Sequence, residues 1–429
     1  MPAFPADHPQ RYVMANELHA RPFPVVQVPA QVAFVAFKPE RDAARRDRAL
    51  DRAHLLALLD RHGATYPAPD ATHHACSIGR DRLKWESHTE FVTYTAIRPG
   101  HALGAFDPAI FSVFPEDWLT GAPGCRVTSI LMQIDRMPDS DGALSDALAD
   151  WFDGESLAHA EVLDGAAVVA ADFRIDPAGH LRMAVFLHPD AGPRRLGRIV
   201  QRLCEIETYK TMSMLGLVRA RGLSGRMGSL DARLSQIADA MTRPDSAAEA
   251  TLSELLSISA ELEQVLVQSS FRFGATRAYE ALVQERIEAL RERRHHASQT
   301  MAEFMARRYL PAMRTVRASE ARLQALAERA MRAATLLGAR VDVERSAQNQ
   351  RLLESMDKRA DLQLRLQKTV EGLSVVAISY YAVGLISGMV KPAAVAAGLA
   401  DAMVTALVTP PVVLLVWLAV RRIRRKLTS

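Results

Sequence analysis

Two uncharged apolar stretches near the C-terminus constrain the fold of this chain more than any other feature. They cover residues 372–390 and 402–420, and each is 19 residues long. At about 1.5 Å per residue, a helix of this length spans the roughly 30 Å hydrocarbon core of a bilayer. Only 11 residues, 391–401, separate the two stretches. We therefore expect a transmembrane hairpin of two helices, with the lipid bilayer as a partner.

Charged residues beside these stretches predict the orientation of the hairpin. Arg365 and Lys368 precede the first stretch, and a basic tail at residues 421–429 follows the second. Cationic flanks stay on the cytoplasmic side of a membrane, so both termini are expected there. The first ten residues contain three prolines and lack the apolar core of a secretory signal. About 370 residues are therefore expected to remain in the cytoplasm.

The charge balance differs between the two regions that precede the hairpin. Residues 1–192 hold 17 Lys and Arg against 26 Asp and Glu, whereas residues 193–371 hold 30 against 22. The basic residues lie toward the membrane, where anionic head groups attract them. Arg-rich segments such as Arg291–His296 lack the interleaved aromatic residues typical of nucleic-acid binders. We therefore expect no nucleic-acid partner.

Residues 1–192 have the pattern of a cytoplasmic head domain that mixes strands and helices. Short alternating or β-branched runs predict a mixed sheet of about five or six strands, and Asp176–Gly179 predicts a hairpin turn. The fold class expected for this region is α+β. The predicted strands are Gln31–Phe37, Leu83–Ile97, Arg126–Ile134, Gly165–Arg174 and His180–Leu187, and the predicted helices are Glu40–Arg61 and Gly142–Phe152.

Residues 193–371 are predicted to form a helical stalk. Pro193 suits the first turn of a helix, and residues 244–246 interrupt the pattern before a second helical block that ends near Pro311. An amphipathic stripe then continues into the first apolar stretch, which predicts helix from Ala312 to Val390, either continuous or bent near Gly338. The stripe includes Leu323, Leu326, Ala330, Val341, Leu352, Met356 and Leu366. The stripe needs a partner. The alternatives are the preceding helices of the same chain, or other copies in a homo-oligomer of the coiled-coil type.

Four collinear motifs resemble those of a bacterial protein family. The resemblance is to the domain of unknown function 3422 family, whose members are described as predicted membrane-anchored proteins. It implies membrane anchorage and an α/β head, and no activity is established for that family. With the predicted orientation of the hairpin, the expected location is the bacterial inner (plasma) membrane. The motifs are Asn16–Phe23, Lys84–Phe91, Glu207–Tyr209 and the C-terminal segment 348–385, which includes Thr369–Tyr381.

A looser likeness in architecture is to the CorA-type divalent-cation channels. Those channels also join an acidic cytoplasmic head to a long helix, a two-span hairpin and a basic tail. They carry Gly-Met-Asn at the end of the first span, where this chain has Gly388-Met389-Val390 and lacks the asparagine. The likeness implies an oligomeric ion channel or transporter, and the missing asparagine puts selectivity of that kind in doubt.

Two groups of residues in the head domain are candidates for binding. His19 and Arg21 can hold an anion, since Arg offers a bidentate fork and His a titratable donor. The alternative is an extended arm that nearby prolines stiffen. Glu86, His88 and Glu90 share one face of a predicted strand and can bind a divalent metal or support acid–base chemistry. The alternative is a solvated sheet face with cross-strand ion pairs.

The first apolar stretch contains candidates for a pore or for helix packing. Gly384 and Gly388 form a Gly-x-x-x-Gly pair that allows another helix to approach closely. Ser374 and Tyr381 lie on the same side of the helix as Gly388, where they can line a polar path or pack in an interface. Glu371 forms an acidic ring if subunits surround an axis, and is otherwise an interfacial carboxylate.

Motifs of enzymatic chemistry are missing from the sequence. No Gly-rich phosphate loop, nucleophile elbow or zinc-type spacing is present. Asp139–Gly142 matches the start of a calcium loop, but the rest of that pattern is missing. These observations disfavour an enzyme and leave cofactors and further protein partners unassigned. Our hypothesis is a membrane-anchored, self-associating binding or scaffold module that faces the cytoplasm. The alternative is a CorA-like channel for divalent cations.

Overall fold

The computed structural model describes residues 5–17, 22–101, 104–243, 247–396 and 400–427. These residues belong to two compact units. The first unit comprises residues 1–243 and 253–333, and the second comprises residues 244–252 and 334–429. The sheet and the helices that cover it lie in the first unit, whereas the two apolar stretches lie in the second.

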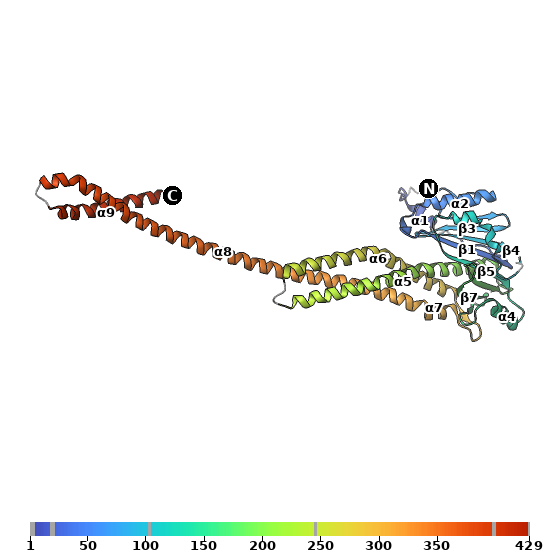
Figure 1. Cartoon of the computed structure of the whole chain (residues 1–429). Helices are drawn as coiled ribbons and strands as arrows, with labels where there is room; N and C mark the ends of the chain where they lie inside the picture. Colours follow the sequence, from blue (N-terminus) through green and yellow to red (C-terminus); the bar gives the residue numbers. More distant parts are fainter. Residues whose placement is uncertain (1–4, 18–21, 102–103, 244–246, 397–399, 428–429) are drawn as a thin grey trace. The chain divides into compact units, whose positions relative to one another are not determined.

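A mixed sheet forms the centre of the first unit (Figure 1). Within the described residues it has nine strands in the order β2-β3-β4-β1-β5-β8-β7-β6-β9. Neighbouring strands pair antiparallel except for β5 and β8, which are parallel. The strands are β1 (Ala30–Lys38), β2 (His73–Ile78), β3 (Asp81–Ser87), β4 (Val92–Pro99), β5 (Cys125–Arg136), β6 (Ala158–Val162), β7 (Ala167–Ile175), β8 (Leu181–Leu187) and β9 (Arg293–Arg294).

Helices lie between the strands and make up most of the chain after residue 192. The short ones are α1 (Arg11–Glu17), η1 (Ala43–Arg45), α2 (Arg48–His62), η2 (Pro108–Val113), α3 (Glu116–Thr120), α4 (Asp141–Trp151) and α7 (Met301–Arg308). The long ones are α5 (Pro193–Met241), α6 (Ala248–Leu290), α8 (Leu310–Ala396) and α9 (Asp401–Leu427). The predicted fold class, a mixed sheet with long helices and apolar helices at the C-terminus, is confirmed.

Several predicted elements differ from those observed. The run predicted as one strand over Leu83–Ile97 is two strands, β3 and β4, and the turn between them is closed by a 2.9 Å hydrogen bond from the His88 amide to the Phe91 carbonyl. The strands β2, β6 and β9 were not predicted, so the sheet is larger than the five or six strands expected. β2 is a half-exposed edge strand rich in polar residues, which gives it a weak strand pattern.

The region after residue 192 is not helical throughout, contrary to the prediction. α6 ends at Leu290, and Arg291 has a left-handed φ of 50°, which turns the chain out of the helix. The chain then forms β9 before α7 begins with a capping box of Thr300 and Glu303. A short strand of the sheet therefore follows α6 where the sequence predicts continuous helix.

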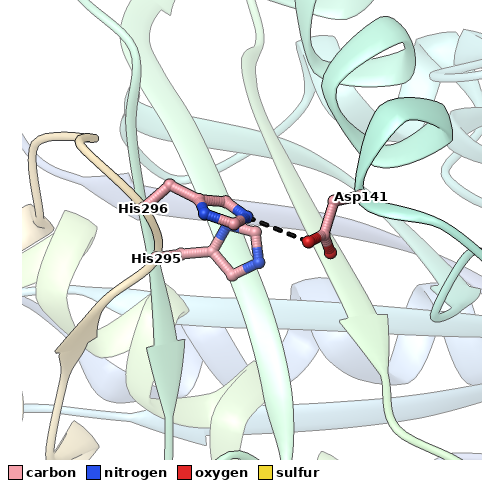
Figure 2. Close-up of side chains that lie close together, drawn as sticks. All are labelled: Asp141, His295 and His296. Carbon is pink, nitrogen blue, oxygen red and sulfur yellow. Dashed lines mark hydrogen bonds and ion pairs between the residues drawn. The ribbon is translucent and has the colours of Figure 1, made fainter.

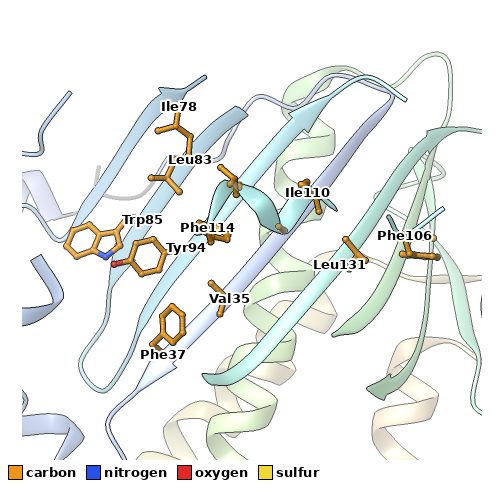
Figure 3. Close-up of a cluster of buried hydrophobic side chains, with 14 of the residues drawn as sticks. Val35, Phe37, Ile78, Leu83, Trp85, Tyr94, Phe106, Ile110, Phe114 and Leu131 are labelled. Carbon is orange, nitrogen blue, oxygen red and sulfur yellow. The ribbon is translucent and has the colours of Figure 1, made fainter. Parts of the chain in front are cut away.

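One face of the sheet carries the aromatic core of the first unit. Alternate residues of its strands, such as Phe37, Trp85 and Tyr94, lie together on this face (Figure 3). The helical segments α2, η2 and α3 contribute further buried residues to the same cluster. His54 stacks on Trp118 at 3.9 Å and donates from Nε2 to the Trp118 carbonyl at 2.9 Å, while Trp118 Nε1 donates to the His54 carbonyl at 2.8 Å. Burial lowers the pKa of His54, so this imidazole packs in its neutral form.

The helices α5, α6 and the first part of α8 pack together in the first unit. Leu323, Leu326 and Ala330 of the predicted stripe are buried there. Ion pairs also join the helices, among them Arg322 with Asp231 at 3.0 Å. The partner of this part of the stripe is therefore the same chain. In the second unit α8 continues as one helix to Ala396, without a break at Gly338, which settles a point that the sequence left open.

Close contact between α5 and α6 depends on Gly216. A Cβ atom at this position would lie 2.2 Å from Oγ1 of the buried residue Thr276. We expect Gly216→Ala to destabilise the first unit by about 1–3 kcal/mol, because Thr276 has little room to move. Gly222, on an exposed side of the same helix, provides the matched control, because a Cβ atom added there would meet no described atom within 4 Å apart from the backbone of its own helix.

The measurement is urea unfolding of the detergent-solubilised chain, followed by tryptophan fluorescence. Gly222→Ala is expected to change the free energy of unfolding by about 1 kcal/mol or less, in the stabilising direction, because alanine favours the helix. Equal effects of the two substitutions would contradict the close approach of α5 and α6 at Gly216.

Candidate functional site

The first predicted binding group, His19 and Arg21, lies outside the described residues. His19 and Arg21 belong to the segment 18–21, which the structure does not describe. The chain after this segment lies against the start of α5, where the Val26 amide donates to the Pro193 carbonyl at 3.2 Å. The proposed role of His19 and Arg21 in anion binding stays a prediction.

The second predicted group, Glu86, His88 and Glu90, does not share one strand face. β3 ends at Ser87, so Glu86 lies in the strand while His88 and Glu90 lie in the turn before β4. Glu86 forms an ion pair with Lys84 at 3.1 Å, and His88 stacks on Phe91 with ring centroids 4.4 Å apart. Both carboxylates have cationic partners from the chain itself, and the metal role of the group stays a prediction.

Glu90 is the most deeply buried member of this group, with 1% of its surface exposed. Arg272 of α6 donates to both carboxylate oxygens, and the Tyr279 hydroxyl donates to Oε1 at 3.1 Å. Burial, with the neighbouring Glu90 charge, raises the pKa of Tyr279. Burial followed by the positive charge of Arg272 lowers the pKa of Lys38 on the adjacent strand β1. The Glu90 charge is therefore neutralised mainly from α6.

Further polar side chains continue this arrangement between the sheet and α5. Lys84 Nζ donates to Gln201 Oε1 at 2.7 Å, and Lys210 pairs with the buried Glu207 carboxylate at 2.6 Å. A small pocket opens in the same layer. We call the set the buried polar layer; its residues are Lys84, Glu86, Glu90, Thr93, Thr95, Gln201, Glu205, Glu207, Thr208, Arg272 and Tyr279.

Two motifs distant in the sequence meet in the buried polar layer. Lys84–Phe91 supplies β3 and the following turn, and Glu207–Tyr209 supplies one turn of α5. The rings of Tyr209 and Tyr279 stack with centroids 5.8 Å apart, and both contact Phe91. The polar pairs and stacked rings of this layer have two possible roles. They can bind a small polar group, or they can give α5 and α6 one specific position on the sheet.

The predicted residues of the hairpin all lie in α8. Glu371, Lys368 and Arg421 line one pocket between α8 and α9. Ser374 Oγ donates within its own helix to the Val370 carbonyl at 2.8 Å. Tyr381 is exposed, and a Cβ atom added at Gly384 or Gly388 would meet no atom of the described residues within 4 Å. The predicted roles in a pore or in packing stay predictions for Glu371, Ser374, Tyr381, Gly384 and Gly388.

A second cluster, which sequence reasoning missed, lies at the other edge of the sheet. Asp141 begins α4, and His295 and His296 follow β9. One ligand atom from each residue lies within 4.8 Å of the other two. Figure 2 shows both imidazole rings beside the Asp141 carboxylate. The only signal in the sequence is the adjacent histidine pair, and no spacing rule connects it with an aspartate 155 residues away.

His159 of β6 lies beside this cluster, with its ring centroid 5.6 Å from that of His295. Burial, followed by the nearby His295 and His296, lowers the pKa of His159 to about 4. The imidazole of His159 is therefore neutral at physiological pH. Together the four side chains offer three imidazoles and one carboxylate at a sheet edge.

Comparison with known proteins assigns the chain to a family. The family model described as Protein of unknown function (DUF3422) matches residues 6–427. The chain belongs to this family. The DUF3422 match spans all four motifs, and therefore both the buried polar layer and the hairpin. No curated protein and no solved structure matches the chain. The likeness to CorA-type channels therefore stays a prediction from architecture.

The Arg272–Glu90 pair provides a test of the buried polar layer in this DUF3422 protein. We expect Arg272→Met to destabilise the first unit by about 3–5 kcal/mol, because it leaves Glu90 buried without its cation. The double variant Arg272→Met/Glu90→Met removes both charges and should recover much of this loss. The measurement is the free energy of urea unfolding, followed by tryptophan fluorescence.

The matched control for this prediction is Arg226→Met on α5. Arg226 pairs with Glu261 at 2.7 Å, but both side chains are partly exposed to solvent. The control should therefore cost less than about 1 kcal/mol. If the two single variants lose the same stability, Glu90 does not depend on Arg272 for neutralisation.

Proposed function

We propose that the chain is a membrane-anchored protein whose C-terminal hairpin holds a binding or scaffold module at the cytoplasmic face of the bacterial inner membrane. The first unit, with its sheet and buried polar layer, is the module. Two helices, α8 and α9, contain stretches long and apolar enough to cross a membrane. The proposal includes insertion of α8 and α9 into the membrane, with both termini of the chain in the cytoplasm.

The observation that carries the proposal is the placement of polar contacts at the two ends of the hairpin. At one end Lys391 of α8 pairs with Asp401 of α9 at 2.5 Å. At the other end Glu371 lies with Lys368 and Arg421 in one pocket. The Arg421 guanidinium also lies 4.9 Å from the ring centre of Trp417. Charged and aromatic residues of this kind are typical of the two membrane–water interfaces.

The distance between these two polar ends matches a bilayer. Residues 372–390 separate them along α8, and 19 helical residues rise about 28 Å. The hydrocarbon core of a typical bilayer is about 30 Å thick. Both polar contacts therefore fall at the expected depth of the head groups when α8 crosses the membrane.

The surface of the hairpin is consistent with a lipid environment. Only 6% of the most apolar window of α8 and 11% of that of α9 is buried within the described residues. Leu385, Met389 and Leu407 each expose more than two thirds of their surface. An apolar surface of this extent is costly in water and needs a cover. Lipid chains supply this cover on both helices.

Self-association is proposed from the middle of α8. Every residue from 342 to 370 is exposed, including apolar ones such as Leu352, Met356 and Leu366. The stripe is buried against the same chain only up to Val341. Other copies of α8 are the partners proposed for the remainder, in a homo-oligomer of the coiled-coil type.

Membrane insertion is tested by a charge placed in the first apolar stretch. We expect Leu385→Asp to weaken partitioning of the chain into membranes by about 100-fold, since an aspartate near the centre of a span costs about 2.5–3.5 kcal/mol. The measurement is the fraction that stays with vesicles after alkaline carbonate extraction. Leu362→Asp, an exposed position of α8 before the stretch, is the matched control and should not change this fraction. Equal loss in both variants would contradict insertion of residues 372–390.

Self-association is tested by the mass of the detergent-solubilised complex, with the detergent subtracted. We expect more than one copy per complex, and a shift toward the monomer in Leu352→Glu/Met356→Glu, because charges at these positions oppose helix pairing. Val218→Glu, on an exposed position of α5, should leave the mass unchanged. A monomeric wild type would contradict self-association. A ring of several copies that conducts divalent cations in liposomes would favour the channel over the scaffold.

A further inference from the structure

The cluster of Asp141, His295 and His296 is assembled by the pairing of β9 with β6. The register places Arg294 opposite Ala160 and Arg293 opposite Glu161. Continued by one residue, this antiparallel register brings His295 opposite His159. The N-terminal end of α4 contributes Asp141 from a separate part of the chain. The cluster therefore depends on tertiary structure, because three elements of the first unit must come together.

The backbone turns both histidines toward the same place. Successive residues of an extended chain project to opposite sides. His296 instead has a left-handed φ of 54°, which is uncommon for any residue other than glycine. The two rings lie 4.4 Å apart between centroids, and His296 Nε2 lies 3.1 Å from Asp141 Oδ2. An unfavourable backbone conformation is thus used to keep two imidazoles beside one carboxylate.

Two imidazole nitrogens at this place lack hydrogen-bond partners. Nδ1 of His295 and Nδ1 of His159 are both buried, and neither has a partner among the residues that the structure describes. A buried polar atom without a partner is unfavourable. The nearby positive charge is partly compensated, since Arg294 of β9 pairs with Glu303 of α7. A cation can therefore approach without facing an uncompensated guanidinium at Arg294.

From this geometry we propose that Asp141, His295 and His296 bind a divalent transition-metal ion of the zinc type. Ligand atoms around tetrahedral zinc lie roughly 3.3 Å apart, so ligand atoms already within 4.8 Å of one another need to move little. Imidazole nitrogen suits zinc, copper, iron and nickel, whereas magnesium and calcium prefer oxygen ligands. The side chains of Asp141 and His296 are 71% and 61% exposed, which gives the ion access from solvent.

Metal binding would join α4 to the loop between β9 and α7. Three ligands from the chain leave at least one coordination position for water or for a group of a partner molecule. His159 stands next to His295, with ring centroids 5.6 Å apart. The bound ion would connect residues 155 positions apart, and the first unit would be more stable with the ion than without it. This inference concerns the sheet edge and does not rest on the proposed membrane function.

The experiment is a zinc titration of the tag-free full chain in detergent after removal of metals with a chelator. Isothermal calorimetry is expected to show one Zn²⁺ per chain. The double variant His295→Gln/His296→Gln should bind at least about 10-fold more weakly. Asp141→Asn, a milder change at an exposed position, should also weaken binding and covers the case in which the double variant fails to fold. Zn²⁺ should raise the unfolding temperature of the wild type and not of the variants.

The matched control is His73→Gln/His74→Gln, which removes the other adjacent histidine pair of the first unit. This control should bind Zn²⁺ as the wild type does. Replacing Zn²⁺ by Co²⁺ provides a second measurement on the unaltered chain, since its visible spectrum reports imidazole ligation. The proposal is overturned if the wild type binds no Zn²⁺ at micromolar concentration, or if the cluster variants bind as tightly as the control. Equally tight binding of Mg²⁺ or Ca²⁺ would overturn the assigned class of metal.

Discussion

The contact between the Glu90 carboxylate and the Arg272 guanidinium fixes the position of α6 on the sheet of the first unit. Glu90 lies in the turn after β3 and Arg272 lies on α6, 182 residues away. Taking both charges out of water is costly, so the arrangement is favourable only when they meet and their remaining hydrogen bonds are satisfied. The Tyr279 hydroxyl, two turns along the same helix, supplies one of those bonds. A shift of α6 along its axis would separate the charges, and the pair therefore fixes the register of this helix.

The two faces of the sheet bury different kinds of side chain. One face carries aromatic and aliphatic side chains, and even its histidine, His54, packs as a neutral ring. The other face carries the buried polar layer, in which Lys84, Glu86 and Glu207 retain charged partners. An apolar layer of the same volume would often be at least as stable. The polar side chains are therefore better explained by specificity, either for one arrangement of α5 and α6 or for a ligand, and two of the sequence motifs lie in this layer.

The sequence predicted elements whose signals are local and missed those that depend on a partner. The strands β1, β5, β7 and β8 follow from their alternating or β-branched runs, and the helical character of residues 312–371 follows from the absence of proline in that stretch. The turn after Ser87 contains neither glycine nor proline, so an uninterrupted strand was expected there. β9 is two residues long and exists only because the edge of β6 offers hydrogen bonds. For the same reason the cluster of Asp141, His295 and His296 could not be found, since its register comes from that pairing.

The part of α6 between Arg272 and Leu290 links the two ends of the sheet. It begins at the Glu90 pair, beside β3 and β4, and it ends where the Leu163 amide donates to the Leu290 carbonyl at 2.8 Å, beside β6. Eighteen residues of helix rise about 27 Å. Five to six strand spacings of about 4.8 Å separate the same places in the strand order, which gives about 24–29 Å. The helix therefore has the length needed to cross from the buried polar layer to the sheet edge. Because β9 directly follows it, any change that moved α6 along its axis would also displace His295 and His296 relative to Asp141.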